Sequence, residues 1–469
     1  MTMFMNRARW MTIGALATLA ALPVLAVGCD LHNALLSPQQ PGVIGPTSVT
    51  TPTGAEALRI GALGAFKTWV AGGGVNFANL AMMGDLLTDE WASGDTQSQH
   101  NETDERTVQT SNGIVSSAYT AVQQARGFSL TAIQALRQYE TPPSPAEVGE
   151  LYFTLGFAEL QMSEVFCNGV PFGSMVNGVP VYTAPVTNAD GFKLASARFD
   201  TALTLVVGAD AASVAIHRVN EIAKARAQVD LGNVAAAAAL LADVPTNFQY
   251  LLTFSLTTTS PELYQLNGTQ GSRFVVGDSF AIVNGAPSTI RNALPFASAG
   301  DPRVPVTGST SNTKKAFDGS TPWVGQALYG QVDAFPVLTG IDARLIEAEA
   351  KLASGDYAGM FATLNALRTS PQQIGNKTMA AMPALTTVPA TKDAAVTLFF
   401  REKAFWQFGR GFRLGDLRRL IRQYGRTQDN VFPAGAWFKG GNYGTDVNLP
   451  MPDVELTNPN FKGCLDRNA

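Results

Sequence analysis

Three carboxylates lie close together in the sequence, and a pair of carboxyl groups is the catalytic equipment of a glycosidase. These residues are Asp85, Asp89 and Glu90. In glycoside hydrolysis one carboxyl group protonates the leaving group, and the other acts as nucleophile or base. The surrounding segment is polar, so the competing interpretation is a solvated loop without catalytic work. We favour the solvated loop.

Other signatures of catalysis are missing from the sequence. It contains no G-x-S-x-G, H-E-x-x-H, C-x-x-C or G-x-x-x-x-G-K motif. The chain has only 3 histidines and 3 cysteines, which leaves little material for a metal centre. We therefore predict a protein that is not an enzyme and that needs no metal ion or cofactor.

Aromatic residues in loop-rich segments are the best candidates for holding a hydroxyl-rich or peptide-like ligand. Aromatic rings stack on the apolar faces of sugars, and carboxylates accept hydrogen bonds from hydroxyl groups. For each ring, burial in the core is the competing interpretation. The candidates for ligand contact are Trp91, Asp89, Trp323, Tyr329, Trp437 and Tyr443.

The elements that must position these residues have a helical period. Apolar residues recur at helical spacing in residues 55–70, 113–139 and 147–166. Residues 219–241 and 341–367 each indicate a helix, a turn with a glycine (Gly232 or Gly355) and a second helix. Such hairpins are typical of tetratricopeptide-type repeats. The sequence therefore predicts a mostly α fold built from helical pairs.

Residues 254–333 interrupt this pattern. They are rich in Thr, Ser, Gly, Pro and Asn and contain one short strand-like run at 272–283. Loops this long are usually functional or disordered. We predict one domain over residues 55–469, with a helical scaffold at about 55–253 and 334–469 and this insertion between the two parts.

Composition narrows the classes of function. Charged residues make up 15% of the chain, against roughly 25% in an ordinary soluble domain. The net charge is −4, from 33 basic and 37 acidic residues. Because a general nucleic-acid binder is normally basic, we predict no nucleic-acid partner.

The N-terminus has the pattern of an export signal. Arg7 and Arg9 precede an apolar run at residues 11–27, and Cys29 follows. The run Ala26-Val27-Gly28-Cys29 resembles a bacterial lipobox, so we predict a signal peptide over 1–28, a lipid on Cys29 and a flexible tether over 29–54. A transmembrane anchor and plain secretion are the alternatives. Asp30 can act as an inner-membrane retention signal, which leaves the choice of membrane open.

Two cysteines remain after Cys29. In an oxidising compartment, a remaining pair suggests one disulfide. It would join Cys167 to Cys464. Two unrelated buried thiols are the alternative.

Motifs near the C-terminus carry a family resemblance. Glu402-Lys403 is followed by Gly411, Arg413, Asp416, Leu417 and Arg419, and then by Pro450, Pro452, Glu455, Asn458 and Pro459. Together they resemble the closing signature of the SusD/RagB family of nutrient-uptake outer-membrane lipoproteins. Arg410 stands where an acid usually precedes the glycine, which indicates a divergent branch.

The resemblance implies a fold and a function. The fold is a tetratricopeptide-like scaffold with a loop-rich ligand-binding insertion, on which some of the aromatic candidates would face a ligand. The function is capture of a nutrient at the surface of the bacterial outer membrane, with a glycan as the first ligand class and an oligopeptide as the second. Delivery would be to a SusC-like TonB-dependent transporter. A lipid-anchored hydrolase and a helical-repeat scaffold for protein partners are the alternatives.

The charged residues of these motifs also have a purely structural interpretation. Residues three and four apart on a helix can pair, and arginine can bind a carboxylate through two hydrogen bonds. We predict that Glu402, Arg413, Asp416 and Arg419 form a salt-bridge network that fixes the last helices on the scaffold.

Overall fold

The structure is a computed structural model that describes residues 51–72, 79–176, 179–257, 259–268, 271–283, 285–308 and 314–469. Val49–Ala469 group together as one unit. The predicted signal peptide, Cys29 and the predicted tether up to residue 50 lie outside the described residues. Among the described helices, none combines the length and the hydropathy that a membrane span requires.

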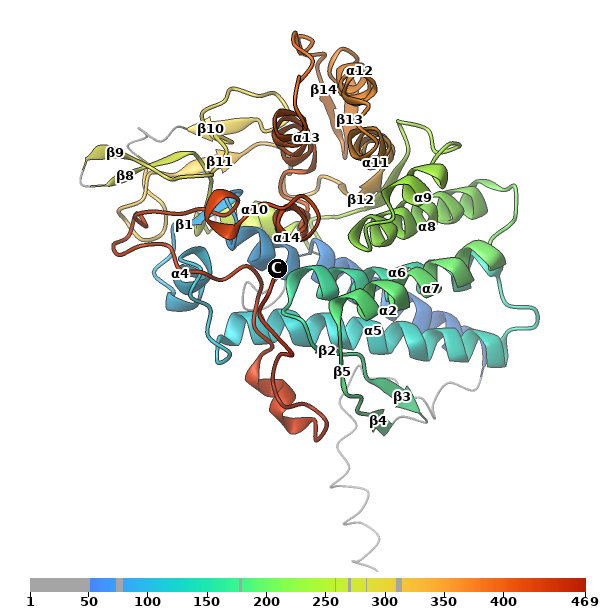
Figure 1. Cartoon of the computed structure of the whole chain (residues 1–469). Helices are drawn as coiled ribbons and strands as arrows, with labels where there is room; N and C mark the ends of the chain where they lie inside the picture. The colour runs from blue at the N-terminus through green and yellow to red at the C-terminus, as the bar shows by residue number, and fades with distance from the viewer. Residues whose placement is uncertain are drawn as a thin grey trace, which may run out of the picture. The chain divides into compact units, whose positions relative to one another are not determined.

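Four long helices pack against one another in chain order and form the first layer of the scaffold (Figure 1). They are α2 (Pro52–Val70), α5 (Gly113–Tyr139), α6 (Pro145–Val165) and α7 (Asn188–Leu205). Each begins after a residue whose side chain accepts a hydrogen bond from a first-turn amide. These N-cap residues are Thr51, Asn112, Ser144 and Thr187.

A glycine brings two of these helices close together. A Cβ atom at Gly156 of α6 would lie 2.6 Å from a ring carbon of Phe199 on α7, which is closer than real Cβ atoms approach. The absence of a side chain therefore allows the Phe199 ring to be buried between the helices.

The two predicted helical hairpins are confirmed. They are α8 (Ala211–Asp230) with α9 (Val234–Ala239), and α11 (Gly340–Ala353) with α12 (Tyr357–Arg368). Gly232 and Gly355 follow the first helix of each hairpin, and both have φ of +83°. This left-handed conformation ends the helix and favours glycine. Helix α9 packs against α11, so the two hairpins are neighbours.

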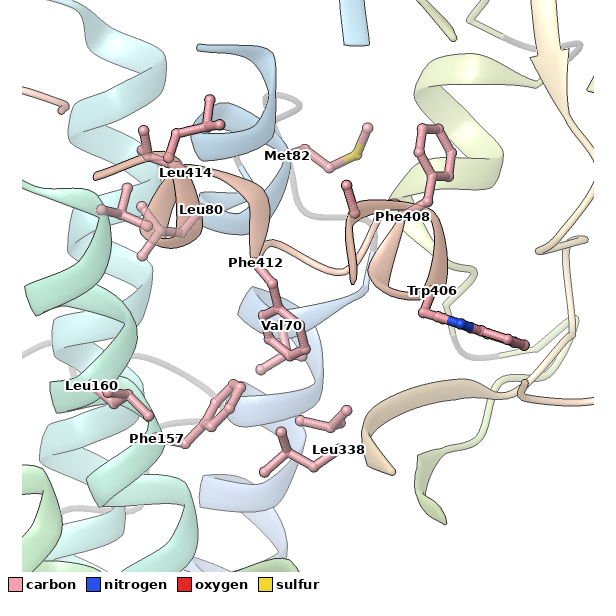
Figure 2. Packing of buried hydrophobic residues seen from close by; sticks show 14 of the residues in the cluster. Val70, Leu80, Met82, Phe157, Leu160, Leu338, Trp406, Phe408, Phe412 and Leu414 are labelled. Carbon is pink, nitrogen blue, oxygen red and sulfur yellow. The ribbon is translucent and has the colours of Figure 1, made fainter. Parts of the chain in front are cut away.

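Helices α13 (Lys392–Gln407) and α14 (Arg413–Arg422) pack onto this scaffold. The turn between them contributes Phe412, which Figure 2 shows directed toward Val70 and Phe157. All three side chains are buried in the main hydrophobic cluster. A residue far along the chain therefore completes the core that α2 and α6 begin.

The insertion leaves and rejoins the scaffold through one antiparallel pair of strands. Strand β6 (Gln249–Leu252) pairs with β12 (Phe335–Thr339). Among its described residues, the insertion contains one short helix and several small strands. Figure 1 shows them near β1. These are α10 (Glu262–Asn267), β7 (Phe274–Val276), β8 (Phe280–Val283), β9 (Ala286–Thr289), β10 (Val306–Gly308) and β11 (Val324–Gln326).

The polar segment that surrounds Asp89 and Glu90 and extends to residue 105 is largely ordered secondary structure. It contains β1 (Trp91–Ser93) and α4 (Ser98–Asp104), and β1 pairs with β7 of the insertion. Helix α3 (Leu80–Leu86) precedes this segment. The other short elements are β2 (Val170–Pro171), β3 (Ser174–Val176), β4 (Val179–Val181), β5 (Pro185–Val186), β13 (Gln372–Ile374), β14 (Lys377–Met379), η2 (Gln428–Asn430) and η3 (Asp453–Thr457).

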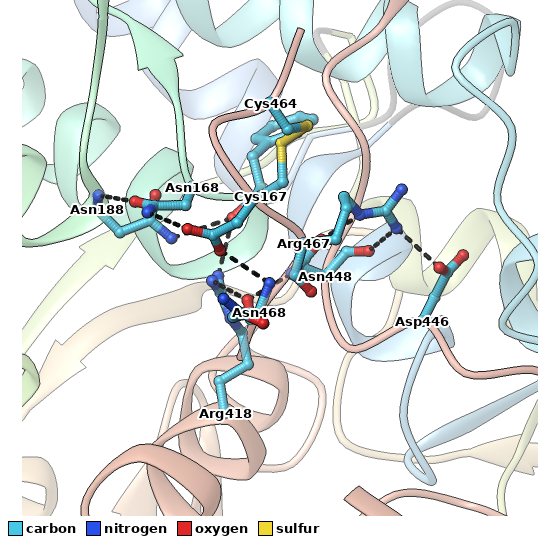
Figure 3. The surroundings of a disulfide bond; sticks show 11 residues. Cys167, Asn168, Asn188, Arg418, Asp446, Asn448, Cys464, Arg467 and Asn468 are labelled. Carbon is cyan, nitrogen blue, oxygen red and sulfur yellow. Dashed lines mark hydrogen bonds and ion pairs between the residues drawn. A yellow bond between two sulfur atoms is a disulfide. The ribbon is translucent and has the colours of Figure 1, made fainter.

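A disulfide joins Cys167, after α6, to Cys464 near the C-terminus (Figure 3). Their Cα atoms are 6.0 Å apart. Beside this bond, the Arg418 guanidinium donates hydrogen bonds to the backbone carbonyls of Glu164 at 2.6 Å and Phe166 at 2.9 Å. Helix α14 and the end of the chain are thereby fixed to the end of α6.

Candidate ligand-binding groove

The three neighbouring carboxylates are buried, so the expectation of a solvated loop is wrong. Asp85 accepts a hydrogen bond from the Gly411 amide at 2.8 Å, and Glu90 accepts one from the Gly409 amide at 3.0 Å. Both glycines have positive φ, +71° at Gly409 and +77° at Gly411. The carboxylates therefore hold the glycine turn between α13 and α14.

Asp89 belongs to the same arrangement. Its two carboxylate oxygens lie 2.7 and 2.9 Å from Nε and Nη2 of Arg413. One of these oxygens also accepts the Leu294 amide at 2.7 Å. Because both oxygens are engaged inside the protein, the burial of Asp89 does not fit its prediction as a ligand contact.

Burial also changes the acidity of this cluster. It raises the pKa of Asp85 to about 7, although the hydrogen bond from the Gly411 amide acts in the opposite direction. Burial, and then the charge of Asp85, raises the pKa of Glu90 well above its ordinary value. Asp85 is 1% exposed and Glu90 is 0% exposed. Neither group is therefore presented to a substrate, as acid–base catalysis requires.

The charged C-terminal motif residues form buried ion pairs with distant elements. Asp416 lies 2.7 Å from Lys403 and 3.2 Å from Arg419, and Arg419 also pairs with Glu349 of α11. Glu402 pairs with Arg303 of the insertion at 2.6 Å and with Arg368 of α12 at 3.0 Å. We name residues 402–419 the α13–α14 junction. Its ion pairs connect α11, α12 and the insertion to helices α13 and α14.

Three of the aromatic candidates are buried, which does not fit their prediction as ligand contacts. The Trp91 ring packs on Phe408 with centroids 5.0 Å apart. The Tyr329 ring packs on Phe335 at 5.2 Å. Trp437 is buried and donates its indole N–H to Asp104 at 3.2 Å. Burying a large aromatic ring removes much apolar surface from water, which is favourable. This gain explains why the three rings lie in the core.

The other two aromatic candidates are half-buried. Trp323 donates its indole N–H to the Asn267 carbonyl at 2.8 Å, and the Lys314 ammonium lies 3.3 Å from the centre of its ring. The backbone amide of Tyr443 donates to the Gly435 carbonyl at 3.0 Å. Whether either ring contacts a ligand stays a prediction.

A groove lies between the insertion and two loops of the scaffold side. Its volume is about 590 Å³, within the range of small-molecule sites. The β7–β8–β9 segment forms one wall, and residues 315–322 with Phe438 and Lys439 form another. Its apolar lining includes Phe280, Ile282, Ile290 and Phe438, and its polar lining includes Asp95, Asn101, Asp278, Asp318 and Lys439.

Lys439 is fixed at the edge of this groove by three oxygen atoms. Its ammonium lies 3.0 Å from a carboxylate oxygen of Asp318, 3.0 Å from the side-chain oxygen of Asn101 and 2.7 Å from the Asp95 carbonyl. Burial opposes the ionisation of Asp318, but hydrogen bonds from Thr321 and neighbours lower its pKa to about 2. Lys439 and Asp318 thus form a preorganised ion pair.

Comparisons with known proteins give the fold a name. No family model and no curated protein sequence match the chain. Many solved structures do match. One is a SusD superfamily protein from Bacteroides fragilis (14% identity, 88% of this chain and 99% of that chain, TM-score 0.60). Others are a protein described as a laminarin binding SusD-like protein (14%, 89% and 99%, 0.59) and a SusD-like carbohydrate binding protein from Bacteroides vulgatus (13%, 78% and 83%, 0.53).

This chain has a SusD-like fold. The resemblance inferred from the C-terminal motifs is confirmed at the level of the fold, and so is the prediction of a mostly α architecture. In this SusD-like fold, the residues of those motifs that we predicted as a charge network lie at the α13–α14 junction and not in the groove.

The groove of the SusD-like chain includes residues that the sequence did not single out. Asp278 and Phe280 lie in the strand-like run predicted at 272–283, and Lys439 follows about 160 positions later. Phe438 directly follows the candidate Trp437, but the two rings differ, because Trp437 is buried and Phe438 lines the groove. Phe438 and Lys439 lie in a turn that the Gly440 amide closes on the Trp437 carbonyl at 3.0 Å, and no periodic pattern in the sequence marks Phe438 as a lining residue.

Proposed function

We propose that this protein captures a glycan in the groove and delivers it to a SusC-like TonB-dependent transporter of the outer membrane. An oligopeptide is the second ligand class. Two structural neighbours are described as laminarin binding and carbohydrate binding, which supports the glycan class. The protein binds its ligand and does not cleave it, since the clustered carboxylates serve the fold.

The lining of the groove is the observation that carries this proposal. Phe280 and Phe438 supply aromatic surface for the apolar faces of sugar rings. Asp318 and Asp278 supply oxygen atoms that can accept hydrogen bonds from hydroxyl groups. Apolar surface with a few fixed polar groups is the usual composition of a small-molecule site.

The ligand class can be tested with the purified full-length protein on an array of neutral and acidic glycans and of peptides. Hits are then measured by isothermal titration calorimetry. We expect saturable binding to at least one glycan. Binding only to peptides would replace the ligand class, and binding to neither would contradict capture of these nutrients.

The membrane part of the proposal depends on Cys29 and on the predicted tether. We propose that the acylated Cys29 holds the unit formed by residues 49–469 at the cell surface. Cys29→Ser should move the protein from the outer-membrane fraction to the soluble fraction. A mild-detergent pull-down from native membranes should recover a β-barrel transporter in a stoichiometric amount. Retention in the inner membrane without such a partner would contradict the delivery role.

A further inference from the structure

One carboxylate of the groove is buried with half of its hydrogen-bonding capacity unused. Asp278 is 6% exposed and lines the groove. Its Oδ1 accepts hydrogen bonds from the Ser279 amide at 2.7 Å and the Ser298 hydroxyl at 2.8 Å. Its Oδ2 is also buried, and no described residue donates a hydrogen bond to it. A buried acceptor without a donor is costly. A rotation of the Asp278 side chain that turns Oδ2 toward the groove, where a ligand can donate to it, would therefore be favourable.

The backbone holds Asp278 firmly in this position. The preceding residue, Gly277, donates its amide to the Glu90 carbonyl at 2.8 Å and accepts the Ala297 amide at 3.0 Å. A Cβ atom at Gly277 would lie 2.1 Å from the Asp89 carbonyl oxygen, so only glycine allows this approach. The position of Asp278 is therefore fixed by the segment that carries Asp89 and Glu90, whose buried carboxylates contact the α13–α14 junction.

The other charges that line the groove are already neutralised. Lys439 is paired with Asp318 at 3.0 Å. Asp95 is paired with Arg273 at 2.6 Å and with His100 at 2.8 Å. Lys315 is exposed at the rim, where solvent screens its charge. Among the charged residues that line the groove, Asp278 therefore provides the negative charge that is neither paired nor screened by solvent.

We propose that Asp278 determines the ligand specificity of the groove by accepting a ligand hydroxyl group, and that the groove selects uncharged glycans over acidic ones. This inference rests on the proposed glycan capture. A hydroxyl that donates to a carboxylate forms a charge-assisted hydrogen bond, which is stronger than a neutral one. A uronate or sulfate group placed near Asp278 would instead be repelled, and such repulsion between like charges gives specificity.

Two measurements on the full-length protein test this inference. The first compares wild-type affinities for a neutral β-glucan hexasaccharide and for an oligogalacturonate of equal length by calorimetry. Because burial raises the pKa of Asp278, the titrations are run at about pH 8, where the carboxylate is more fully ionised. We expect the neutral ligand to bind at least about tenfold more tightly. An equal or stronger affinity for the acidic ligand would overturn the inference.

The second measurement uses Asp278→Asn, which keeps the size of the side chain and removes its charge. We expect weaker binding of the neutral hexasaccharide by about fivefold or more, and stronger binding of the acidic one. A merely structural role would weaken both. The matched control is Glu221→Gln on α8, a half-buried acid away from the groove whose pKa is also raised by burial; it should leave both affinities unchanged.

The outcomes separate the inference from the proposed function. If the wild-type protein binds the neutral ligand and Asp278→Asn binds both ligands as the wild type does, the specificity role of Asp278 is wrong while glycan capture stands. If the wild-type protein binds no glycan at all, glycan capture fails and the inference fails with it.

Discussion

The α13–α14 junction and the groove use buried charge in opposite ways. At the junction, Glu402, Asp416 and Arg419 are buried, and each has at least one ion-pair partner. In the groove, Asp278 is equally buried, yet one of its oxygens finds no donor among the described residues. The buried charges of the junction form ion pairs that hold distant elements together. The carboxylate of Asp278 in the groove has no such ion-pair partner among the described residues.

This difference shows where function can be sought in such a chain. The junction contains the densest run of charged residues near the C-terminus, and that density reflects its task of joining α11, α12 and the insertion. The groove is lined by the β7–β8 segment together with short stretches from other parts of the chain. The conspicuous charged motif therefore supports the fold here, and the residues that we propose to bind the ligand are less conspicuous in the sequence.

The largest effect is expected from breaking a junction ion pair. Arg413→Met leaves Asp89 buried without its partner, so the free energy of unfolding should fall by about 3–5 kcal/mol. Urea denaturation measures this change. The control Lys193→Met removes the solvent-exposed pair with Asp190 and should change little. Equal decreases in the free energy of unfolding in the two variants would mean that the buried ion pairs of the junction do not contribute more to stability than an exposed pair does.

A smaller loss is expected from the glycine turn. Gly411 has φ of +77°, and an added Cβ atom would lie 2.5 Å from that of Ala81. Gly411→Ala should lower the free energy of unfolding by about 2–4 kcal/mol, from backbone strain and crowding together. Gly355→Ala has a similar φ but open space around it, and should lose only about 1–2 kcal/mol. Similar losses would show that crowding at Gly411 is unimportant.

The two regions should also respond to pH with opposite signs. Because the pKa of Asp85 rises from its ordinary 3.8 to about 7, the folded protein holds a proton that the unfolded chain releases. The stability that Asp85 contributes is full below about pH 4 and is lost as the pH rises through about 7. Asp85→Asn, measured by urea denaturation across this range, should therefore gain stability relative to the wild type as the pH rises.

Asp318 in the groove provides the contrast. Its pKa is lowered from 3.8 to about 2, so the stability it contributes is present above about pH 4 and is lost as the pH falls through about 2. Asp318→Asn should approach the wild type in stability only under acid conditions. If the free energy of unfolding of both variants, relative to the wild type, changed with pH in the same direction, the opposite pKa shifts of Asp85 and Asp318 would be contradicted.

The smallest change in stability is expected in the groove, together with a clear change in binding. Phe438 is half-buried and lines the groove. Phe438→Ala should weaken glycan binding by about fivefold with little change in melting temperature, since a stacking contact contributes about 1 kcal/mol. Phe317→Ala removes a ring that is 50% exposed and lies outside the groove lining. Loss of binding in this control would place the ligand elsewhere.

Local patterns in the sequence were sufficient to predict the scaffold. The helices at 113–139 and 147–166 correspond to α5 and α6, and the glycine turns at Gly232 and Gly355 close the two hairpins. These features depend on the spacing of apolar residues and on the backbone conformation of single glycines, and a short stretch of sequence contains both kinds of information. The C-terminal motifs indicated the fold through their family resemblance, and four of their charged residues, Glu402, Arg413, Asp416 and Arg419, lie at the α13–α14 junction.

The candidate site was much less predictable, because it depends on contacts between distant segments. Trp91 lies in a polar segment, but its strand pairs with β7 more than 180 residues later, and that pairing buries the ring. Asp85 and Glu90 look solvated in the sequence because their glycine partners lie 326 and 319 residues away. The groove residues share no period or spacing that a one-dimensional pattern could detect.

The distance between partners at the junction has a consequence for the order of folding. Asp85 and Asp89 emerge early from a ribosome or an export channel, and their partners Gly411 and Arg413 emerge more than 320 residues later. Long-range contacts of this kind slow folding, because loop closure must precede the gain. The helical pairs can form from neighbouring segments of the chain, but the contacts of Asp85 and Asp89 with residues 411 and 413 cannot form until those residues are present. Asp85 and Asp89 therefore gain the partners that they have in the folded protein only after residues 411–413 have been synthesised.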